Sequence, residues 1–429
     1  MSDSAFAEHV RRASALALFI TAVAAAASAQ DDLEQRVERL EEQNRQLQQQ
    51  NAELADKIDI LDQEFERFEL KDVFKKPGES FYGLGPAASK VYLGDGLSVG
   101  GYGEILFQDR SGEVDRFDAQ RGVLYVGYKF DEHWIVNSEI EIEHATTSAS
   151  SGTTAEGGSA SLEFAYLDYI ANDVIAARGG LLLIPMGLIN EMHEPTTYLA
   201  ATRPQTESRI LPSTWRENGL GVFGDAGGFE YRAYVVNGLD GEEFSASGIR
   251  DGRQKGNRAA AEDVAVVGRV DWVDVPGLKV GGSVYYGDSG QDEAGVPDLG
   301  TTLYEVHADH RAGRWWVRGL YAGAHIDDAA EFNAATGENL ADGMAGYYVS
   351  LGYDVLRDSR HSLMPYTRYE WIDTQASVPA GSVPDPTQED ELLTLGLRYQ
   401  PIPQAVLKLE YVAATESTDG VNFLIGYVF

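Results

Sequence analysis

Apolar or aromatic side chains occupy every second position at the end of the chain, in VNFLIGYVF, residues 421–429. They are Val421, Phe423, Ile425, Tyr427 and Phe429. A period of two places them on one face of a β-strand. A strand that stops at a terminal aromatic residue is typical of the closing strand of a bacterial outer-membrane barrel. The alternative is an amphipathic strand of a soluble protein. In the barrel interpretation, we expect an assembly signal formed by Phe423, Ile425, Tyr427 and Phe429.

The same strand pattern recurs from Leu97 onward. Sixteen candidate strands lie near 97–108, 117–130, 134–145, 159–170, 174–187, 219–226, 229–238, 263–274, 278–289, 301–312, 314–327, 345–356, 363–374, 392–400, 404–416 and 421–429. Most have about the 9–11 residues, or slightly more, that a tilted membrane-spanning strand needs.

The connections between these strands alternate between short and long. The short ones include 131–133, 171–173, 227–228, 275–277 and 401–403, and the long ones include 146–158, 188–218, 239–262, 328–344 and 375–391. Short turns at one end and long loops at the other are the arrangement of an outer-membrane barrel. The predicted fold is therefore all-β, a sixteen-stranded antiparallel transmembrane β-barrel over 97–429.

The N-terminus has the pattern of a secretory signal peptide. Arg11 and Arg12 precede an apolar stretch from Ala13 to Ala26, and the small-residue sequence Ala27-Ser28-Ala29 follows. We expect residues 1–29 to be removed on export. No later segment approaches the roughly 20 apolar residues of a spanning helix, so a protein that spans a membrane here must be a closed barrel.

A heptad repeat covers residues 33–68. Its two seam positions are filled by Leu33, Leu40, Leu47, Leu54, Leu61 and Phe68 and by Val37, Asn44, Asn51, Ile58 and Phe65. The pattern predicts a periplasmic α-helical coiled coil over 30–70. Asparagine opposite leucine in the seam favours a coiled coil of two helices, whereas a barrel that assembles as a trimer favours three. Residues 71–96 are rich in glycine and proline at their start and are predicted to be a linker.

Composition narrows the chemistry. The chain has no cysteine, and its 68 acidic residues outnumber its 34 basic ones. Such a charge excludes nucleic acid as a partner, because phosphate backbones need cationic surfaces. Acidic external loops could instead face divalent cations. His307 and His310 lie three apart, on opposite faces of a strand, and no nucleophile motif accompanies them. We therefore expect neither enzymatic activity nor a cofactor or bound metal.

The chain resembles the phosphate-selective porin O and P family. The resemblance rests on GGLLLIPMG at 179–187, on Arg203-Pro204 and Arg209 in the following loop, and on LPSTWRENGLGVFG at 211–224. It implies a trimer with one aqueous pore per subunit and a third external loop that folds inward. The length and apolar content of the connection 188–218 indicate the same loop independently. Its candidate pore-constriction residues are Glu191, His193, Glu194, Arg203, Glu207, Arg209 and Arg216. His193 is expected to be solvated.

The candidate pore wall is charged. The alternation of side chains along each strand places a set of charged residues toward the lumen. They are Glu104, Arg121, Lys129, Glu139, Glu141, Glu143 and Arg178. They either set up a transverse field across the pore or only neutralise one another between strands. Only Lys129, Lys255, Lys279 and Lys408 follow Val91, which departs from a phosphate-selective channel. If the loop arginines pair with Glu191, Glu194 and Glu207, wall carboxylates dominate and cations are preferred.

The predicted function is an outer-membrane porin for passive diffusion of small ions and polar solutes. The alternative is a trimeric spacer or tether between outer membrane and cell wall whose barrel is mainly an anchor. The expected partners are further copies of the chain in a homotrimer, outer-membrane lipid and lipopolysaccharide, and the permeating solutes, with peptidoglycan as a further candidate.

Overall fold

The computed structural model describes residue 36, residues 40–54, residue 57 and residues 81–148, 157–357 and 359–429. The chain divides into two units, Met1–Phe74 and Lys75–Phe429. The first unit contains a helix over residues 40–54. The predicted signal peptide and the ends of the heptad region lie outside the described residues. Within the described part of the chain, no helix has the length and apolar character needed to cross a membrane.

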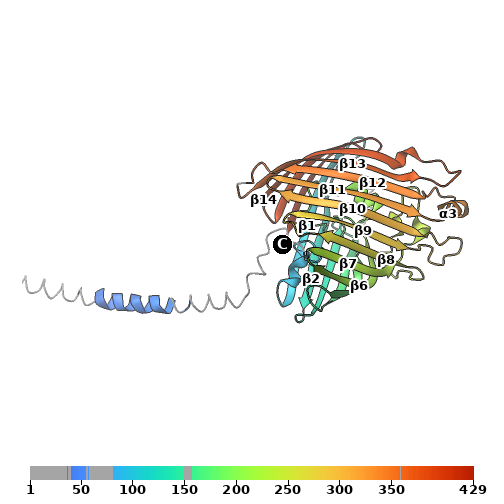
Figure 1. Ribbon diagram of the computed structural model, residues 1–429. Helices are drawn as coiled ribbons and strands as arrows, with labels where there is room; N and C mark the ends of the chain where they lie inside the picture. Colours follow the sequence, from blue (N-terminus) through green and yellow to red (C-terminus); the bar gives the residue numbers. More distant parts are fainter. Residues whose placement is uncertain (1–35, 37–39, 55–56, 58–80, 149–156, 358) are drawn as a thin grey trace, which may run out of the picture. The chain divides into compact units, whose positions relative to one another are not determined.

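The second unit is a closed barrel of sixteen antiparallel strands, which confirms the predicted fold (Figure 1). The strands are β1 (Gly96–Arg110), β2 (Arg116–Lys129), β3 (Trp134–Glu143), β4 (Ala160–Ile170), β5 (Ala176–Leu183), β6 (Arg216–Ala226), β7 (Phe229–Asn237), β8 (Val264–Trp272), β9 (Leu278–Gly287), β10 (Thr301–Ala312), β11 (Trp315–Ile326), β12 (Gly343–Tyr353), β13 (Ser362–Ser377), β14 (Glu389–Ile402), β15 (Ala405–Ala414) and β16 (Gly420–Val428). The shorter helical elements are η1 (Ala88–Tyr92), η2 (Thr206–Ile210), η3 (Gly241–Glu243), η4 (Arg250–Gly252), α3 (Ala329–Thr336) and η5 (Pro386–Gln388).

The first and last strands close the barrel. Phe107 lies opposite Phe423 in the register of β1 and β16. Beyond β16, the Phe429 N–H donates to the Gly101 carbonyl at 2.9 Å, and the Gly101 N–H donates to the Phe429 carbonyl at 3.0 Å. A Cβ atom on Gly101 would lie 2.3 Å from the Val123 carbonyl oxygen and 2.7 Å from the Phe429 ring. Glycine at this position therefore makes room for both the neighbouring strand and the terminal aromatic residue.

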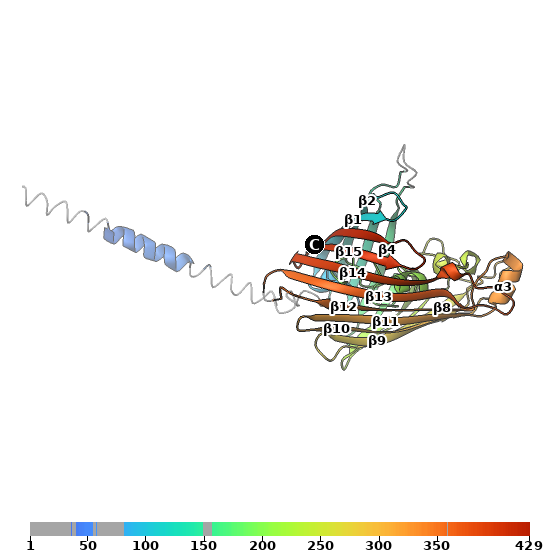
Figure 2. The same cartoon turned by 90° about the horizontal axis from the view of Figure 1, so that it is seen from above.

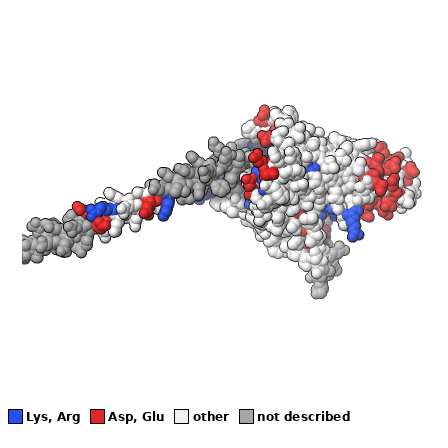
Figure 3. Space-filling model, turned by 90° about the horizontal axis from the view of Figure 1, so that it is seen from below, with Lys and Arg blue, Asp and Glu red and all other residues white. Residues whose placement is uncertain are grey.

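The outer face of the barrel is an apolar band. Period two leaves large apolar side chains exposed on strand after strand, including Leu124, Ile140, Leu167, Val222, Val266, Val284, Val306, Val349, Leu395 and Leu409. Aromatic side chains are exposed near the strand ends, including Phe117, Trp134, Tyr169, Tyr286, Trp315, Tyr353, Tyr411 and Tyr427. Figure 3 shows few charged side chains on one side of the barrel between its two ends. An apolar band with aromatic edges is the surface of a membrane barrel.

The two ends of the barrel differ, as the alternating connections predict. The short turns lie together at one end, and the long connections with α3 lie at the other (Figures 1 and 2). Acidic side chains gather at the long-loop end (Figure 3). They include the exposed residues Asp292, Glu293, Asp298, Asp327, Asp328 and Glu331.

The predicted boundaries around the longest connection need correction. Strand β5 ends at Leu183 and not at 187, because Pro185 has no N–H to continue the ladder. Strand β6 begins at Arg216, which pairs with Leu183, so the long connection spans residues 184–215. The predicted linker over 71–96 is also wrong in its last part. Residues 81–93 pack inside the barrel, because small apolar residues such as Ala88 fit against its wall.

Candidate functional site

The connection 184–215, called the inward loop here, lies inside the barrel. Ile184, Ile189, Ile210 and Trp215 are fully buried, and Ile184, Ile210 and Trp215 belong to a core that includes residues from the inner face of the barrel. Apolar side chains of a loop in open water would not be buried in this way. The inward loop therefore packs against the wall within the lumen.

Glu207 holds the two halves of the inward loop together. Its Oε2 atom accepts hydrogen bonds from the backbone N–H groups of Leu188 at 2.8 Å and Ile189 at 2.7 Å. Its Oε1 atom accepts from the Tyr348 hydroxyl of β12 at 2.6 Å. A single buried carboxylate thus fixes the loop to itself and to the wall.

Several cations of the wall donate to carbonyl groups of the loop, and the four that reach residues 196–202 at 3.1 Å or less are called the anchoring cations. The contacts are Arg398 to Thr196 at 3.0 Å, Arg318 to Thr197 at 3.1 Å, Lys408 to Ala200 at 2.8 Å and Arg368 to Thr202 at 2.8 Å. The cations come from β14, β11, β15 and β13. Charge-assisted bonds of this kind are stronger than neutral ones, so this side of the barrel holds the loop firmly.

Strands β1 and β3 also contact the loop. The Tyr198 hydroxyl donates to Glu104 of β1 at 2.7 Å. His193 Nε2 lies 3.1 Å from Glu139 of β3, while His193 Nδ1 lies 2.9 Å from the Asn190 carbonyl. Burial lowers the pKa of His193 to about 4, and the charge of Arg203 acts in the same direction. His193 is therefore buried and neutral, which corrects the expectation of a solvated histidine.

A charged cluster lies where the inward loop faces β1 to β4. Arg121 contacts three wall carboxylates, Glu104 at 3.1 Å, Glu141 at 3.3 Å and Glu143 at 3.4 Å. Arg203 of the loop lies in the same field, and its Nε and Nη2 atoms have no hydrogen-bond partner among the described residues. The predicted residues from β1, β2 and β3 thus come together with a loop arginine.

Sequence reasoning missed Glu163. It is buried and pairs with Arg216 at 2.6 Å. Strict alternation along β4 would place Glu163 and Phe164 on opposite faces, yet both are buried. The register between β3 and β4 shifts at Glu139, and a β-bulge of this kind turns an extra side chain inward. A glutamate within an otherwise apolar strand was the available signal.

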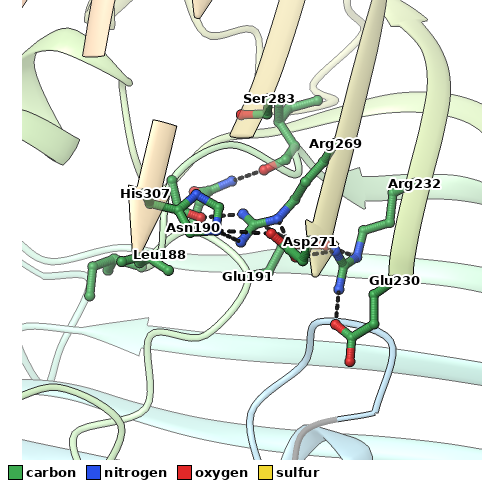
Figure 4. A network of polar contacts seen from close by, with 12 residues as sticks. Leu188, Asn190, Glu191, Glu230, Arg232, Arg269, Asp271, Ser283 and His307 are labelled. Carbon is green, nitrogen blue, oxygen red and sulfur yellow. Dashed lines mark hydrogen bonds and ion pairs between the residues drawn. The ribbon is translucent and has the colours of Figure 1, made fainter. Parts of the chain in front are cut away.

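A second network joins the inward loop to β7, β8 and β10 (Figure 4). Glu191 of the loop pairs with Arg232 at 3.2 Å, and Arg269 pairs with Asp271 at 2.8 Å. The buried His307 contacts Asp271 at 2.9 Å through Nε2 and Glu305 at 2.8 Å through Nδ1. Arg269 also donates to the Gly187 carbonyl. These residues, apart from Glu191, were not predicted, because neighbouring acids and bases on separate strands give no local motif.

The remaining predicted residues lie apart from one another. Lys129 pairs with Asp95 at 3.3 Å, and Arg178 pairs with Asp168 at 2.8 Å. Arg209 donates to the Gln388 side chain at 2.9 Å.

The expected pairing of loop arginines with loop acids is wrong. Glu191 pairs with wall arginines, Glu207 accepts from backbone N–H groups and Tyr348, and Glu194 accepts from the N–H groups of Ala87 and Ala88. These acids instead find their donors in wall side chains and in backbone N–H groups of the loop and of residues 87–88.

Comparison with solved structures shows the fold. The chain is similar to a Salmonella typhi OmpF in complex with daunomycin, with 14% identity, a TM-score of 0.52, and coverage of 78% of this chain and 98% of that one. It is also similar to the in-vitro folded, trimeric form of OmpT, an outer-membrane protein of Vibrio cholerae. There the identity is 12%, the TM-score 0.51, and the coverage 78% and 100%. The similarity to the phosphate-selective family stays a prediction.

Comparison by sequence identifies a relative. No family model matches the chain. An uncharacterized protein of Aquifex aeolicus (strain VF5) is 38% identical over 366 residues, which cover 81% of this chain and 83% of the relative. Identity at this level over most of both chains shows common descent, and the chain belongs to the same family as this Aquifex aeolicus protein.

Proposed function

We propose that the protein is an outer-membrane channel for small polar solutes and ions, narrowed by its inward loop. The observation that carries this proposal is the anchoring of that loop to strands around the lumen, through Tyr198 to β1, through the anchoring cations to β11 and β13–β15, and through Glu191 to β7. A barrel that served only as an anchor would need no such loop.

The outer surface supports the location. The apolar band and its aromatic edges suit lipid, and the acidic long-loop end would face outward, toward lipopolysaccharide. The short-turn end would face the periplasm. OmpT of Vibrio cholerae, which shares the fold, is an outer-membrane protein and supports the same location.

The charge balance supports weak selectivity. The expected preference for cations required wall carboxylates whose negative charge is not offset by arginines of the loop. Arg121 instead contacts three of them, and Arg216 pairs with Glu163. Cations and acids at the loop therefore largely offset each other within a Debye length, about 8 Å at physiological salt. We propose a channel that discriminates by size more than by sign.

The helix over residues 40–54 supports assembly. Leu40, Leu47 and Leu54 lie one heptad apart, and 55% or more of each side chain is exposed in the single chain. An apolar stripe of this kind is buried when helices associate, and OmpT of similar fold has a trimer form. We propose a homotrimer, with a tether to peptidoglycan as an added role of the helix.

Planar-bilayer recording separates channel from tether. Purified full-length protein should give discrete current steps. A variant that lacks residues 30–80 should still give them, because the residues that follow Phe81 belong to the barrel interior. Folded barrels that stay silent in both forms would contradict the channel and favour the anchor.

A further inference from the structure

A second segment besides the inward loop occupies the lumen. It comprises Phe81–Leu93 and is called the luminal segment. It immediately precedes β1 and lies at the short-turn end, since Gly96 at the start of β1 pairs with Lys129 beside the turn from β2 to β3. Leu84, Ala87, Ala88 and Val91 of this segment are buried, each with 3% exposure or less. The segment is therefore part of the barrel interior.

Polar contacts fix the luminal segment from several directions. The N–H groups of Ala87 and Ala88 donate to Glu194 of the inward loop at 2.9 and 3.1 Å. Asn137 of β3 donates to the Ala88 carbonyl at 3.0 Å. The Tyr92 hydroxyl donates to Asp168 of β4 at 2.7 Å. Buried backbone groups with such partners are costly to expose, so the segment is held in place.

The wall is shaped to receive this segment. A Cβ atom on Gly127 of β2 would lie 2.6 Å from Val91 Cγ2, and one on Gly100 of β1 would lie 2.9 Å from the Ala87 carbonyl oxygen. Real side chains do not fit at these distances. Glycine at these two wall positions thus allows the backbone of the segment to approach closely.

A cavity lies beside the segment. It has a volume of about 430 Å³ and is lined by Gly83 of the segment, by Leu188 and Glu191 of the inward loop, and by side chains of β7 to β11. The basic ones among them are Arg232, Arg269, Lys279, Arg311 and Arg318, and the acidic ones are Glu230 and Asp309. Gly83 of the segment and side chains of the wall therefore line the same cavity.

We infer that the luminal segment is a second, fixed constriction of the pore. It fills the part of the short-turn end next to β2–β5 and confines the permeation path to the cavity beside Gly83. This inference rests on the proposed channel function. It adds that two elements narrow the pore, the inward loop and the residues that precede the first strand.

Two variants of the full chain change this constriction in opposite directions. Deletion of residues 81–93 should raise single-channel conductance about twofold, because the path widens. Gly83→Asn should lower it by about a third, because the new side chain would meet the Arg232 guanidinium and displace it into the cavity. Asparagine tolerates the positive φ of +86° at Gly83 better than most residues do.

Gly112→Asn is the matched control. Gly112 has a φ of +81° in an exposed turn, and a Cβ atom added there would meet no other atom within 4 Å, so conductance should not change. If wild type conducts and the Gly83→Asn variant gives current steps of the same size, the second constriction is excluded while the proposed channel function stands. If the deletion variant does not fold, the conductance of Gly83→Asn compared with that of Gly112→Asn still tests the second constriction. A wild type without any steps would contradict the proposed function itself.

Discussion

The Tyr198 hydroxyl donates a hydrogen bond to Glu104 across 2.7 Å, and this contact joins the middle of the inward loop to the first strand of the barrel. The centre of the Tyr198 ring lies 3.6 Å from the Lys408 ammonium of β15. One aromatic residue therefore contacts an acid on one strand and a cation on another. Its position shows how the lumen holds the loop without covalent links.

Replacing Tyr198 by phenylalanine should loosen the loop. The substitution removes the hydroxyl but keeps the ring, and loss of one buried hydrogen bond to a charged group costs about 1.5–3 kcal/mol. Hydrogen exchange of the backbone around residues 196–202 should become about tenfold faster or more, with the strands unchanged. Tyr411→Phe is the control, since Tyr411 bonds Asp419 on the exposed surface. Equal protection in all three proteins would show that this contact does not hold the loop.

Arg121 should control the sign of selectivity. Arg121→Gln uncovers Glu104, Glu141 and Glu143 and should shift the reversal potential in a salt gradient toward cation preference. Glu141→Gln should shift it in the opposite direction. Arg116→Gln, an exposed charge at the start of β2, should have little effect. Shifts of the same sign in the first two variants would exclude this charge cluster from the permeation path.

The stability of the inward loop should fall between neutral and alkaline pH. Burial raises the pKa of Glu194 to about 8 from an ordinary value of 4.5. The folded state thus keeps a proton that the unfolded chain releases, so the stabilisation is complete below about pH 4.5 and is lost as pH rises through 8. His193, whose pKa is lowered to about 4 from 6.5, acts in the opposite sense, at pH values below 6.5.

Above about pH 6.5 the His193 contribution is complete, so the decline in stability between about pH 6.5 and about pH 8 includes the Glu194 contribution. The thermal midpoint of the detergent-solubilised barrel should decrease with pH across this window, and Glu194→Gln should reduce that slope. The luminal segment keeps an acceptor in this variant, because the glutamine carbonyl can bond the N–H groups of Ala87 and Ala88. An unchanged slope in Glu194→Gln would assign the pH dependence to other groups.

The helix over residues 40–54 should drive assembly. Leu47→Asp with Leu54→Asp places charges on the apolar stripe, where association would strip their hydration. Trimers should form more slowly or dissociate at lower temperature, while the barrel stays folded. Gln46→Asp with Gln49→Asp adds the same charge away from the stripe and serves as the control. Trimers of the leucine variant that resist heat and detergent like wild type would exclude this role.

The fold could be predicted because period two is a strong local signal. Ile140 and Ile142 face outward and Glu139 and Glu141 inward, as the alternation along β3 requires. The long connection between β5 and β6 was also recognisable, since its apolar residues needed a surface to cover. Alternation could not predict the bulge that turns Glu163 inward, because a shift of register depends on the partner strand.

The partners of the charged residues could not be predicted either. Glu191 and Arg232 lie on separate elements far apart in sequence, and only the closed barrel brings them to 3.2 Å. The luminal segment was hidden for a related reason. Its glycine, proline and alanine residues have the composition of a linker, and their burial follows from the space left by Gly100 and Gly127 on the wall. Long-range packing, and not local propensity, decides such features.

Uptake of neutral solutes of graded size into liposomes tests the central claim most directly, because uncharged probes report the width of the water-filled path without electrostatic effects. Proteoliposomes with purified full-length protein should swell in small sugars and should exclude progressively larger oligosaccharides, as a channel narrowed by the inward loop requires. Two results would contradict the account. No swelling with any solute would mean a barrel that does not conduct, and equal swelling with small and large solutes would mean a lumen without a constriction.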